Sequence, residues 1–562
     1  MNRNQVKDFF QLISGKNFRL KIFFEGVFTG ICVGLVISAF RYLLERAENF
    51  RVYSYELSAG SGLPGIIIRF AVLILVAGVI SLIISKAPQT AGSGIVQVKG
   101  FLLGHVKLKW ARNLIGKFLG ALIAIGAGLS LGRQGPAVQM GASVGQGISR
   151  LLGRLRVEEK YLVTCGAGAG LAAAFNAPLA GVVFALEEVH KSFSPAALLS
   201  TMGAALSADF VMRQFFGAKP VLDFSGILIL PQNYYLALLG LGLCCGLVGA
   251  LFNKILVQTY KLYDRLRAAF PFLPSAWFPL GPLLIAGILG FFLPQVLGGG
   301  EGFILSLAEQ SYVLSFLLLL LVVKFFFTMV CAASGAPGGI FLPMLVIGAL
   351  VGGSYGHALA NLNQVSPELI PNFVVFAMAA LFTAVVKAPI TGSILITEMT
   401  GSFQHLLPVI ITCMVAYLVS DLLQIRSIYD DLFQLTIIAP AKARKNRAGE
   451  EEANSPVSKP LTESGQRYPA EEISANKYAK TIIEEVVCQG SRLEGRKVRN
   501  IEWPEGCLVV SIRRGEEEII PRGDTKMIAG DFLYILGPQA REKELRRQLG
   551  RLCREDMQNC RF

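Results

Sequence analysis

Long apolar stretches recur from about Ile22 to Ile425 and predict helices that cross a membrane. Examples are Ile66 to Ile84, Tyr234 to Leu256 and Ser315 to Val330. A helix needs about 20 apolar residues to cross the hydrocarbon core of a bilayer. Several stretches are longer than this or are interrupted by Gly and Pro, so the number of crossings does not follow from a simple count. The pattern predicts a polytopic, all-α membrane domain.

This apolar pattern ends after Ile438. The next segment is rich in charged residues, Pro, Ser and Asn without apolar periodicity, which is typical of a linker. Beyond it, apolar and polar residues alternate between Gly-containing turns, as in short strands. The predicted strands are Thr481–Cys488, Cys507–Ile512 and Phe532–Leu536, followed by a charged helix over Glu542–Cys553. The expected divisions are an N-terminal segment (1–21), a membrane domain (22–438), a linker (439–480) and a small α+β module (481–562).

Composition supports the membrane assignment and excludes other classes. Of the 562 residues, 53% are hydrophobic and 16% charged, whereas soluble proteins carry about 25% charged residues. Basic residues precede the first apolar stretch and favour a cytoplasmic N-terminus. The net charge of +14 is dispersed, with no nucleic-acid-reading module, so we expect no nucleic-acid partner. The ten cysteines form no Cys-x-x-Cys pair and there are four histidines, so we expect no disulfide and no metal site.

Three glycine-rich breaks lie inside apolar sequence, at Gly92–Val96, Gly132–Pro136 and Gly339–Pro343. A helix that ends within hydrocarbon must direct its unpaired backbone groups at a partner. Helix N-termini offer free N–H groups and roughly half a positive charge, so several that converge favour a small anion. Broken helices near the middle of a bilayer are also typical of transporter sites. The breaks therefore predict an anion pathway.

The membrane block repeats itself. Pro178 is followed nine residues later by Glu187, and Pro389 is followed nine residues later by Glu398. The second and third breaks each precede one of these prolines by about forty to fifty residues. Two halves with corresponding broken helices predict an inverted repeat with its site where the halves meet.

The same motifs resemble those of the CLC chloride channel and transporter family. The first break is similar to its Gly-Ser-Gly-Ile-Pro motif, with Val96 in place of proline, and the second to Gly-Arg-Glu-Gly-Pro, with Gln134 in place of glutamate. The third matches Gly-x-Phe-x-Pro throughout. Further family-like stretches are Phe175–Gly181, Lys387–Gly392 and Ser427–Asp430, so that the resemblance covers about Phe23 to Leu435.

The resemblance implies that chloride is the transported ion and that it meets hydroxyl and backbone donors. Taken alone, Ser93 is typical of a helix N-cap and Tyr429 of an anchor at the membrane interface. The family uses the equivalent hydroxyls as chloride ligands. The implied chloride-binding residues are Ser93, Gly94, Ile95, Ile340, Phe341 and Tyr429.

Gln134 occupies the position of the family's gating glutamate. An amide cannot ionise and is similar in size and polarity to a protonated carboxylic acid. It therefore cannot compete with an anion for the site as a charge, and it cannot carry a proton. We therefore expect passive, proton-uncoupled chloride flux. Two explanations fit: a substitution introduced to hold the gate open, or a natural member that has lost coupling. The retained proton-path residue Glu188 favours the first.

Glu188 matches the inner proton-accepting glutamate of the family's exchangers, and an ionisable residue within apolar sequence is a functional candidate by default. Glu187 and Glu398 are interpreted as structural. A supporting role at the second break, which holds the loop or raises the positive potential there, is expected for Arg133, Gly135, Pro136 and Lys117. For Arg133 and Lys117 the alternative is a structural salt bridge.

The tail resembles the C-terminal half of the regulator-of-potassium-conductance module, TrkA-C, over Thr481 to Leu536. Such modules bind a small ligand or dimerise. The run Gly166–Gly170 lacks the third glycine of a dinucleotide loop and is interpreted as a helix-packing surface.

These features together predict a multi-pass chloride transport protein of a bacterial-type plasma membrane, homodimeric by resemblance, with both termini cytoplasmic. It is expected not to be an enzyme and to need no cofactor. The exchanger-type scaffold is the first expectation. The alternatives are a naturally passive channel, a carrier of fluoride or nitrate, and, in a different class, a ligand-sensing membrane receptor.

Overall fold

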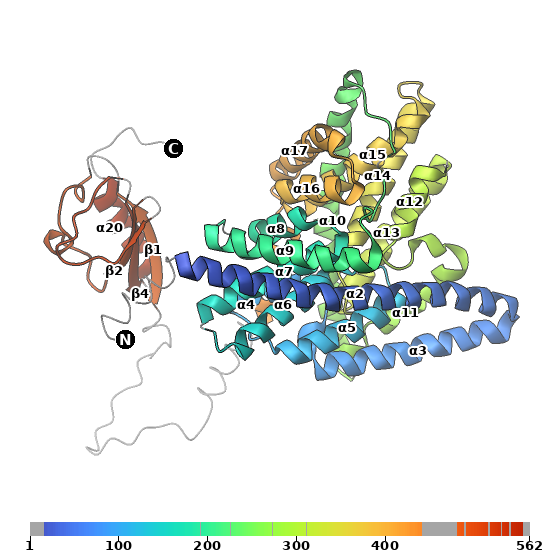
Figure 1. Ribbon diagram of the computed structural model, residues 1–562, viewed down its shortest axis with the longest axis horizontal. Coiled ribbons are helices and arrows are strands. Elements are labelled where there is room, and N and C mark those ends of the chain that lie inside the picture. Colours follow the sequence, from blue (N-terminus) through green and yellow to red (C-terminus); the bar gives the residue numbers. More distant parts are fainter. Residues whose placement is uncertain are drawn as a thin grey trace, which may run out of the picture. The chain divides into compact units, whose positions relative to one another are not determined.

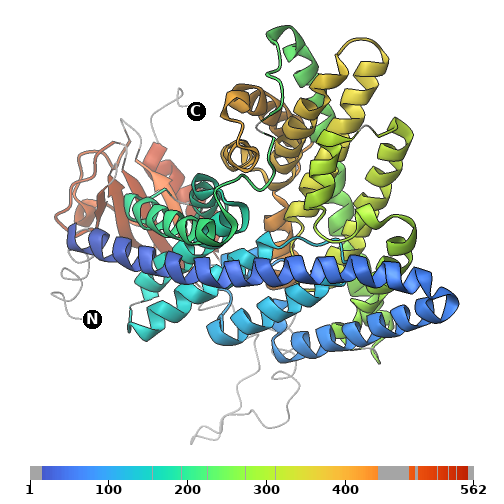
Figure 2. The same ribbon diagram turned by 45° about the vertical axis from the view of Figure 1, so that its right-hand side comes forward.

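The structure is a computed structural model that describes residues 16–440 and 480–554, apart from 155, 192, 225, 273, 311, 488–490, 515–516, 530 and 539–540. The chain divides into two compact units, Met1–Ala453 and Asn454–Phe562. Figures 1 and 2 show a helical first unit and a second unit built around a sheet. Most of the predicted linker, 441–479, lies outside the described residues, as does 1–15 of the N-terminal segment.

The first unit is built almost entirely from helices. Its N-terminal half contains α2 (Lys16–Gly60), α3 (Gly62–Lys86), α4 (Ile95–Leu102), α5 (Trp110–Gly126), α6 (Gln134–Leu151), α7 (Arg156–Phe175), α8 (Pro178–Phe184) and α9 (Pro195–Phe216). Its C-terminal half contains α10 (Tyr235–Ala269), α11 (Leu280–Phe292), α12 (Glu301–Glu309), α13 (Leu314–Ala333), α14 (Phe341–Asn361), α15 (Ile370–Val386), α16 (Pro389–Thr400), α17 (Leu406–Leu422) and α18 (Ile428–Phe433). Two π-helical turns, η2 (Ala185–His190) and η8 (Gln434–Ile438), continue α8 and α18.

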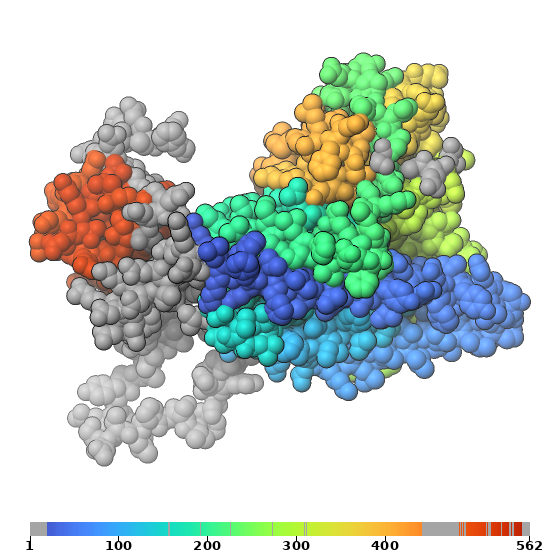
Figure 3. Space-filling model, viewed as in Figure 1, coloured from blue at the N-terminus to red at the C-terminus, as the bar shows by residue number. Residues whose placement is uncertain are grey.

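Within the described part of the chain, nine helical segments are long and apolar enough to cross a membrane. They are Arg19–Gly60, Gly62–Lys86, Pro195–Phe216, Gln232–Ala269, Ser275–Phe292, Leu314–Ala333, Phe341–Asn361, Pro367–Val386 and Phe403–Leu422. Helices α2 and α3, in blue, lie on the surface of the unit in Figure 3. On α3 the large apolar side chains Ile67, Ile68 and Leu75 are each more than 60% exposed. Such a surface is suited to lipid rather than water, and the first unit is an integral, multi-pass membrane domain.

The predicted repeat is present in the helices. The short helices α4 and α8 of the first half correspond to α12 and α16 of the second, and all four are too short to cross a bilayer. The halves meet at a small antiparallel β-bridge between Gly132 and Gly339. Each glycine lies two residues ahead of a helix, α6 or α14, so equivalent residues of the two halves pair with one another. The expected all-α inverted repeat with broken helices is confirmed.

Two glutamates at equivalent positions hold the halves together. The Glu187 carboxylate accepts hydrogen bonds from the Thr391 backbone N–H (2.8 Å) and hydroxyl (2.6 Å), at the start of α16. The Glu398 carboxylate accepts from the N–H groups of Leu179 (3.1 Å) and Ala180 (2.8 Å), at the start of α8. Each carboxylate therefore satisfies free donors at the N-terminus of the other half's broken helix. This reciprocal capping is a structural role, as interpreted for both residues.

Glycines let helices α6 and α7 approach to backbone contact. A Cβ added to Gly141 would lie 2.0 Å from the Gly166 carbonyl oxygen, and one added to Gly166 would lie 2.1 Å from that of Gly141. A Cβ on Gly170 would lie 2.2 Å from the Ala137 carbonyl oxygen. Small residues with this spacing let two helix backbones touch. The interpretation of Gly166–Gly170 as a helix-packing surface is confirmed.

The second unit is a small α+β module. Its antiparallel sheet has the order β1-β4-β2-β3, and one helix follows the last strand. The elements are β1 (Lys480–Val486), β2 (Leu508–Arg514), β3 (Glu517–Ile519), β4 (Phe532–Pro538) and α20 (Glu542–Arg554). Side chains of β4 alternate between buried and half-buried, and its buried face joins α20 in a separate apolar core. The sequence pattern missed β3, because three residues beside a turn carry too little alternation to stand out.

Candidate anion site and its inner approach

The three glycine-rich breaks meet in the middle of the membrane domain. The Gly132 N–H donates to the Gly339 carbonyl (2.6 Å), and the Gly339 N–H donates back (2.9 Å). The Gly92 N–H donates to Gly335 (3.3 Å), and the Gly338 N–H donates to Gly92 (3.1 Å). The third break thus binds the second through Gly339, and the segment just ahead of it, Gly335 to Gly338, binds the first.

Glycine is needed where the breaks touch. A Cβ added to Gly135 would lie 2.7 Å from the Ser93 hydroxyl oxygen and 3.1 Å from the Cα atom of Gly339. Gly94 has φ = 97°, in the region that favours glycine, and a Cβ there would lie 2.6 Å from the Gln139 amide oxygen. The absence of side chains at these positions brings Ser93 against the start of α6.

Three helix N-termini face this meeting point. Helices α4, α6 and α14 begin at Ile95, Gln134 and Phe341, within the three breaks. The first N–H groups of a helix have no partner within that helix and carry partial positive charge. Converging N-termini offer an anion several hydrogen-bond donors without presenting a full positive charge.

Two buried hydroxyls lack partners here. Ser93, at the first break, is 8% exposed, and Tyr429, in the first turn of α18, is fully buried. Neither hydroxyl has a hydrogen-bond partner among the described residues. Helix α18 packs against α4, α10 and α15, so Tyr429 belongs to the same helical cluster as Ser93. A buried hydroxyl without a partner is unfavourable by about 1–3 kcal/mol and calls for a specific explanation.

Gln134 is buried at the same point. It has no exposed surface, and neither atom of its amide has a partner within the described part of the chain. Its amide oxygen lies 2.5 Å from the position that a Cβ on Gly132 would take. The side chain therefore lies against the second break, without a charge.

Aromatic rings enclose the third N-terminus. The ring centroid of Phe341 lies 4.7 Å from that of Phe382, 5.3 Å from Phe175 and 6.2 Å from Phe184. Ile340, the N-cap of α14, is 2% exposed. These side chains pack in an apolar cluster while their backbone N–H groups stay at the helix start.

Arg133 and Lys117 support the breaks in different ways. Arg133, beside Gln134, forms a salt bridge with Glu301 at the start of α12 (3.0 Å) and donates to the Ala174 carbonyl (3.3 Å). Lys117 is fully buried on α5, and its amine donates to the carbonyl oxygens of Thr90 and Gly92, at the first break. The salt-bridge alternative thus describes Arg133, whereas the partners of Lys117 are backbone carbonyls.

Lys324 is the equivalent of Lys117 in the second half and was not predicted from the sequence. Its buried amine donates to the carbonyl oxygens of Val296 (2.9 Å) and Gly298 (3.0 Å), ahead of α12. Lys117 lies seventeen residues before Gln134, and Lys324 lies seventeen residues before Phe341. The internal repeat, extended residue by residue, would have found it.

Glu188 lies on the π-helical turn η2 and forms a buried ion pair with Lys99 of α4 (2.9 Å). The Lys99 amine also forms an ion pair with Asp430, next to Tyr429. Lys191, just after η2, completes the group with a bond to Asp430 (3.0 Å). The sequence analysis identified Glu188 but missed Lys99, Lys191 and Asp430. Their proximity follows from contacts between elements that are far apart in the sequence.

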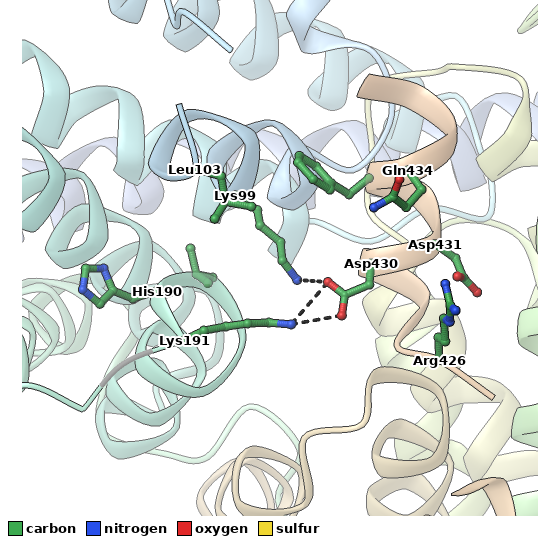
Figure 4. Close-up of a pocket in the computed structure, with 10 residues that line it drawn as sticks. Lys99, Leu103, His190, Lys191, Arg426, Asp430, Asp431 and Gln434 are labelled. Carbon is green, nitrogen blue, oxygen red and sulfur yellow. Dashed lines mark hydrogen bonds and ion pairs between the residues drawn. The ribbon is translucent and has the colours of Figure 1, made fainter. Parts of the chain in front are cut away.

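Figure 4 shows the Lys99 and Lys191 amines both directed at the Asp430 carboxylate, in a pocket of about 350 Å³ that Arg426 also lines. A neighbouring pocket of about 430 Å³ is lined by Glu188, Lys191 and Asp430, among others. The ion-paired cluster therefore borders open space next to Tyr429.

Comparison with known families settles the ancestry of the membrane domain. The voltage gated chloride channel family matches residues 74–421. This chain belongs to the CLC family. The TrkA-C domain matches residues 482–550, within the second unit, so the resemblance stated for the tail is also confirmed.

Individual CLC relatives are similar over most of the membrane domain. The H(+)/Cl(-) exchange transporter ClcA of Citrobacter koseri is 33% identical over 442 residues, which cover 77% of this chain and 93% of that protein. A slow cyanobacterial Cl-/H+ antiporter is similar in structure, with a TM-score of 0.70 and 29% identity over 76% of this chain and 99% of that one. A CLC-type fluoride/proton antiporter has a TM-score of 0.60 and 25% identity, over 74% of this chain and 99% of that one.

No group of three or more His, Cys, Asp or Glu side chains that could hold a metal ion is found among the described residues. The polar groups at the meeting point of the three breaks are hydroxyl, amide and backbone N–H groups, a set that is suited to an anion.

Proposed function

We propose that this CLC protein carries chloride across the membrane at the meeting point of its three breaks. The observation that carries the proposal is the pair of buried, unpartnered hydroxyls of Ser93 and Tyr429 in the helical cluster where three helix N-termini converge. An anion bound there would satisfy donors that are otherwise left without partners in a water-poor interior. The names of the exchange transporters to which the chain is similar support chloride as the ion.

In this proposal chloride is bound by partial charges alone. The hydroxyls of Ser93 and Tyr429 donate from the side chains, and the backbone near Gly94, Ile95, Ile340 and Phe341 supplies N–H donors. The nearby cations Arg133 and Lys117 are engaged with Glu301 and with backbone carbonyls, respectively. Binding by dipoles is weak enough for release, which conduction requires.

Gln134 is proposed as the gate position and Glu188 as the inner proton acceptor of an exchanger-type scaffold. A glutamate at 134 would be able to ionise, occupy an anion site and take up a proton. The neutral amide can do neither, so chloride passes without proton exchange. Glu188 borders a pocket on the inner side, and it keeps the ion-pair partner Lys99 that stabilises its charge.

Chloride efflux from proteoliposomes tests this proposal. The full-length protein should release chloride down its gradient with no accompanying proton movement. Uphill proton movement driven by chloride would show that Gln134 is not the gate. Absence of chloride flux from well-folded protein would favour the ligand-sensing receptor instead.

A fluoride carrier is the second candidate, because the fold is shared with a fluoride/proton antiporter. Replacing chloride by fluoride or nitrate in the same assay distinguishes these ions. We expect chloride to pass best, since Ser93 is retained where the family's nitrate carriers tend to have proline. Retention of Tyr429 and the Gly-Ser-Gly motif likewise disfavours fluoride.

We further propose that the protein is a homodimer and that its TrkA-C module binds a small-molecule ligand or forms a dimer contact. We also propose that it lies in a bacterial-type plasma membrane with both termini cytoplasmic. The basic residues ahead of the first apolar stretch support this orientation. Accessibility of a cysteine-specific reagent to a single cysteine placed in the tail would test it in intact cells.

A further inference from the structure

Lys99 joins two parts of the proposed mechanism that no other described side chain joins. Its amine forms ion pairs with Glu188, on η2, and with Asp430, on α18. Lys99 itself lies on α4, the helix that begins one residue after Gly94 and two after Ser93. Asp430 directly follows Tyr429. A single amine therefore connects the proton acceptor to the helices that position both chloride-binding hydroxyls.

Burial makes Lys99 the principal counter-charge of Glu188. Their side chains are 4% and 5% exposed, whereas Asp430 is 39% and Lys191 48% exposed. Lys191 bonds Asp430 rather than Glu188. A buried carboxylate without its partner is strongly disfavoured, because the interior does not replace the water that it loses.

The other charged and titratable groups around Glu188 have different partners or positions. Glu187 is bonded to Thr391, His190 contacts Tyr161 and Thr164 of α7 near Lys160, and Lys387 and Arg426 line the pocket. The four charges of Lys99, Lys191, Glu188 and Asp430 cancel while Glu188 is ionised.

We infer that Lys99 is a positioning residue for proton uptake by Glu188. Its positive charge keeps Glu188 ionised, and its second ion pair, with Asp430, links Glu188 to the helix that carries Tyr429. This inference rests on the proposed role of Glu188. A proton that arrives from water in the pocket binds a carboxylate oxygen of Glu188 and ends the attraction to Lys99. Lys99 and Lys191 stay with Asp430, and the cluster changes from neutral to a net charge of +1.

The change in net charge from 0 to +1 favours the binding of chloride. A positive charge beside α18 and α4 makes the potential at the adjacent anion site more favourable, and low-dielectric surroundings strengthen the effect. Proton uptake by Glu188 thus favours chloride near Tyr429. Through Lys99, protonation of Glu188 acts on chloride by electrostatics and needs no large movement of the helices.

An infrared pH titration of the purified full-length protein tests the inference without relying on transport. The protonated-carboxyl band that disappears in Glu188→Gln reports the ionisation of Glu188. In Lys99→Met we expect the midpoint of this band to rise by at least about one pH unit, because one pH unit corresponds to a tenfold change in proton affinity. Lys99→Arg, which keeps the charge, should restore the midpoint.

Two further variants give opposite or smaller shifts. Asp430→Asn should lower the Glu188 midpoint, since it removes a negative neighbour and leaves Lys99 to Glu188 alone. Because Asp430 is partly exposed, this variant tests the inference even where Lys99→Met fails to fold. Lys191→Met is the matched control, and its shift should be less than half that of Lys99→Met, because the half-exposed Lys191 amine bonds Asp430 and acts on Glu188 only through its charge.

An unchanged midpoint in Lys99→Met, or an unchanged or raised midpoint in Asp430→Asn, would overturn the inference. The proposed function fails separately. If Gln134→Glu does not create proton transport while the infrared midpoints move as expected, Lys99 controls the charge of Glu188 but Glu188 is not on a proton pathway.

Discussion

At the scale of single residues, the candidate site contains two buried hydroxyls, those of Ser93 and Tyr429, that have no hydrogen-bond partner among the described residues. Ser93 differs from alanine, and Tyr429 from phenylalanine, by a single hydroxyl group. Either apolar residue would leave no hydroxyl unpaired at its position. Gln134 adds an unpartnered amide beside them. A bound anion would give these groups a partner, and buried polar groups in folded proteins are almost always bonded.

The first prediction concerns the two hydroxyls. Ser93→Ala and Tyr429→Phe should each weaken chloride binding, because a hydrogen bond to a charged group contributes roughly 1.5–3 kcal/mol. This corresponds to about a ten- to hundredfold lower affinity at 25 °C, which calorimetric chloride titration would measure. Tyr235→Phe, on α10 outside the breaks, is a suitable control. Unchanged affinity in both site variants would refute the assignment.

The second prediction concerns the gate. Gln134→Glu should create proton coupling, because it restores an ionisable carboxyl while Glu188 is still present. The double variant Gln134→Glu, Glu188→Gln should pass chloride without moving protons. Simultaneous pH-electrode and chloride-electrode recording on proteoliposomes measures both fluxes. Coupling that survives in the double variant would place the inner acceptor elsewhere, with Glu187 the first residue to examine.

At the scale of secondary-structure elements, short helices whose ends lie inside the membrane domain need partners for their terminal groups. Helices α8 and α16 receive theirs from Glu398 and Glu187, each from the opposite half. The half-helices are therefore held by one another rather than by water.

The third prediction is that Glu398→Ala lowers thermal stability. The substitution leaves the N–H groups of Leu179 and Ala180 without their acceptor, and loss of a helix cap costs about 0.5–2 kcal/mol. Glu187→Ala should have a similar effect at α16, by the symmetry of the two contacts. Thermal unfolding in detergent, followed by size-exclusion chromatography, gives the shift in Tm. Glu368→Ala, on a short turn ahead of α15, is the control, and an equal shift there would contradict the capping role.

The fourth prediction tests the contact between α6 and α7. Gly166→Ala should greatly reduce the yield of folded protein, because the added Cβ would lie 2.1 Å from the Gly141 carbonyl oxygen and two backbones would have to separate. Gly281→Ala is the matched control, since a Cβ there meets no atom within 4 Å. The control should be neutral or slightly stabilising, as alanine favours a helix by up to about 1 kcal/mol over glycine. Equal yields of the two variants would show that α6 and α7 can separate.

At the scale of the whole molecule, the two units have separate apolar cores. The core of the first unit extends as far as η8, where the side chains of Ile437 and Ile438 pack against it. The core of the second unit is formed by its own strands and α20. Every proposed ion ligand lies in the first unit, so transport and the TrkA-C module are separable in principle.

The fifth prediction follows from that separation. A chain that ends at Pro440 should still pass chloride, because every described residue of the first unit's apolar core lies before Pro440. We expect a change in regulation or in Tm rather than loss of flux. The efflux assay on truncated and full-length protein at equal density measures this. A folded truncation without chloride flux would make the tail part of the transport machinery.

The sequence by itself determined the architecture, because it is written in local patterns. Long apolar stretches fix which segments enter lipid, and the glycine-rich breaks mark where helices must end. The spacing of Glu187 and Glu398 after their prolines showed the repeat, and the motifs around Ser93, Gln134 and Tyr429 identified the family. Each of these signals lies within a few neighbouring residues or repeats at a fixed interval.

Only the tertiary structure decided which charged residues meet. Lys99, Glu188 and Asp430 lie on three helices, and nothing in their local sequence says that one amine would bind both carboxylates. The sequence repeat places Lys324 at the position equivalent to Lys117, but its carbonyl partners were visible only in the structure. Burial inside a protein makes such pairings necessary, since an isolated charge there is strongly disfavoured. The choice of partner, however, depends on how distant helices pack, and that is a property of the whole fold.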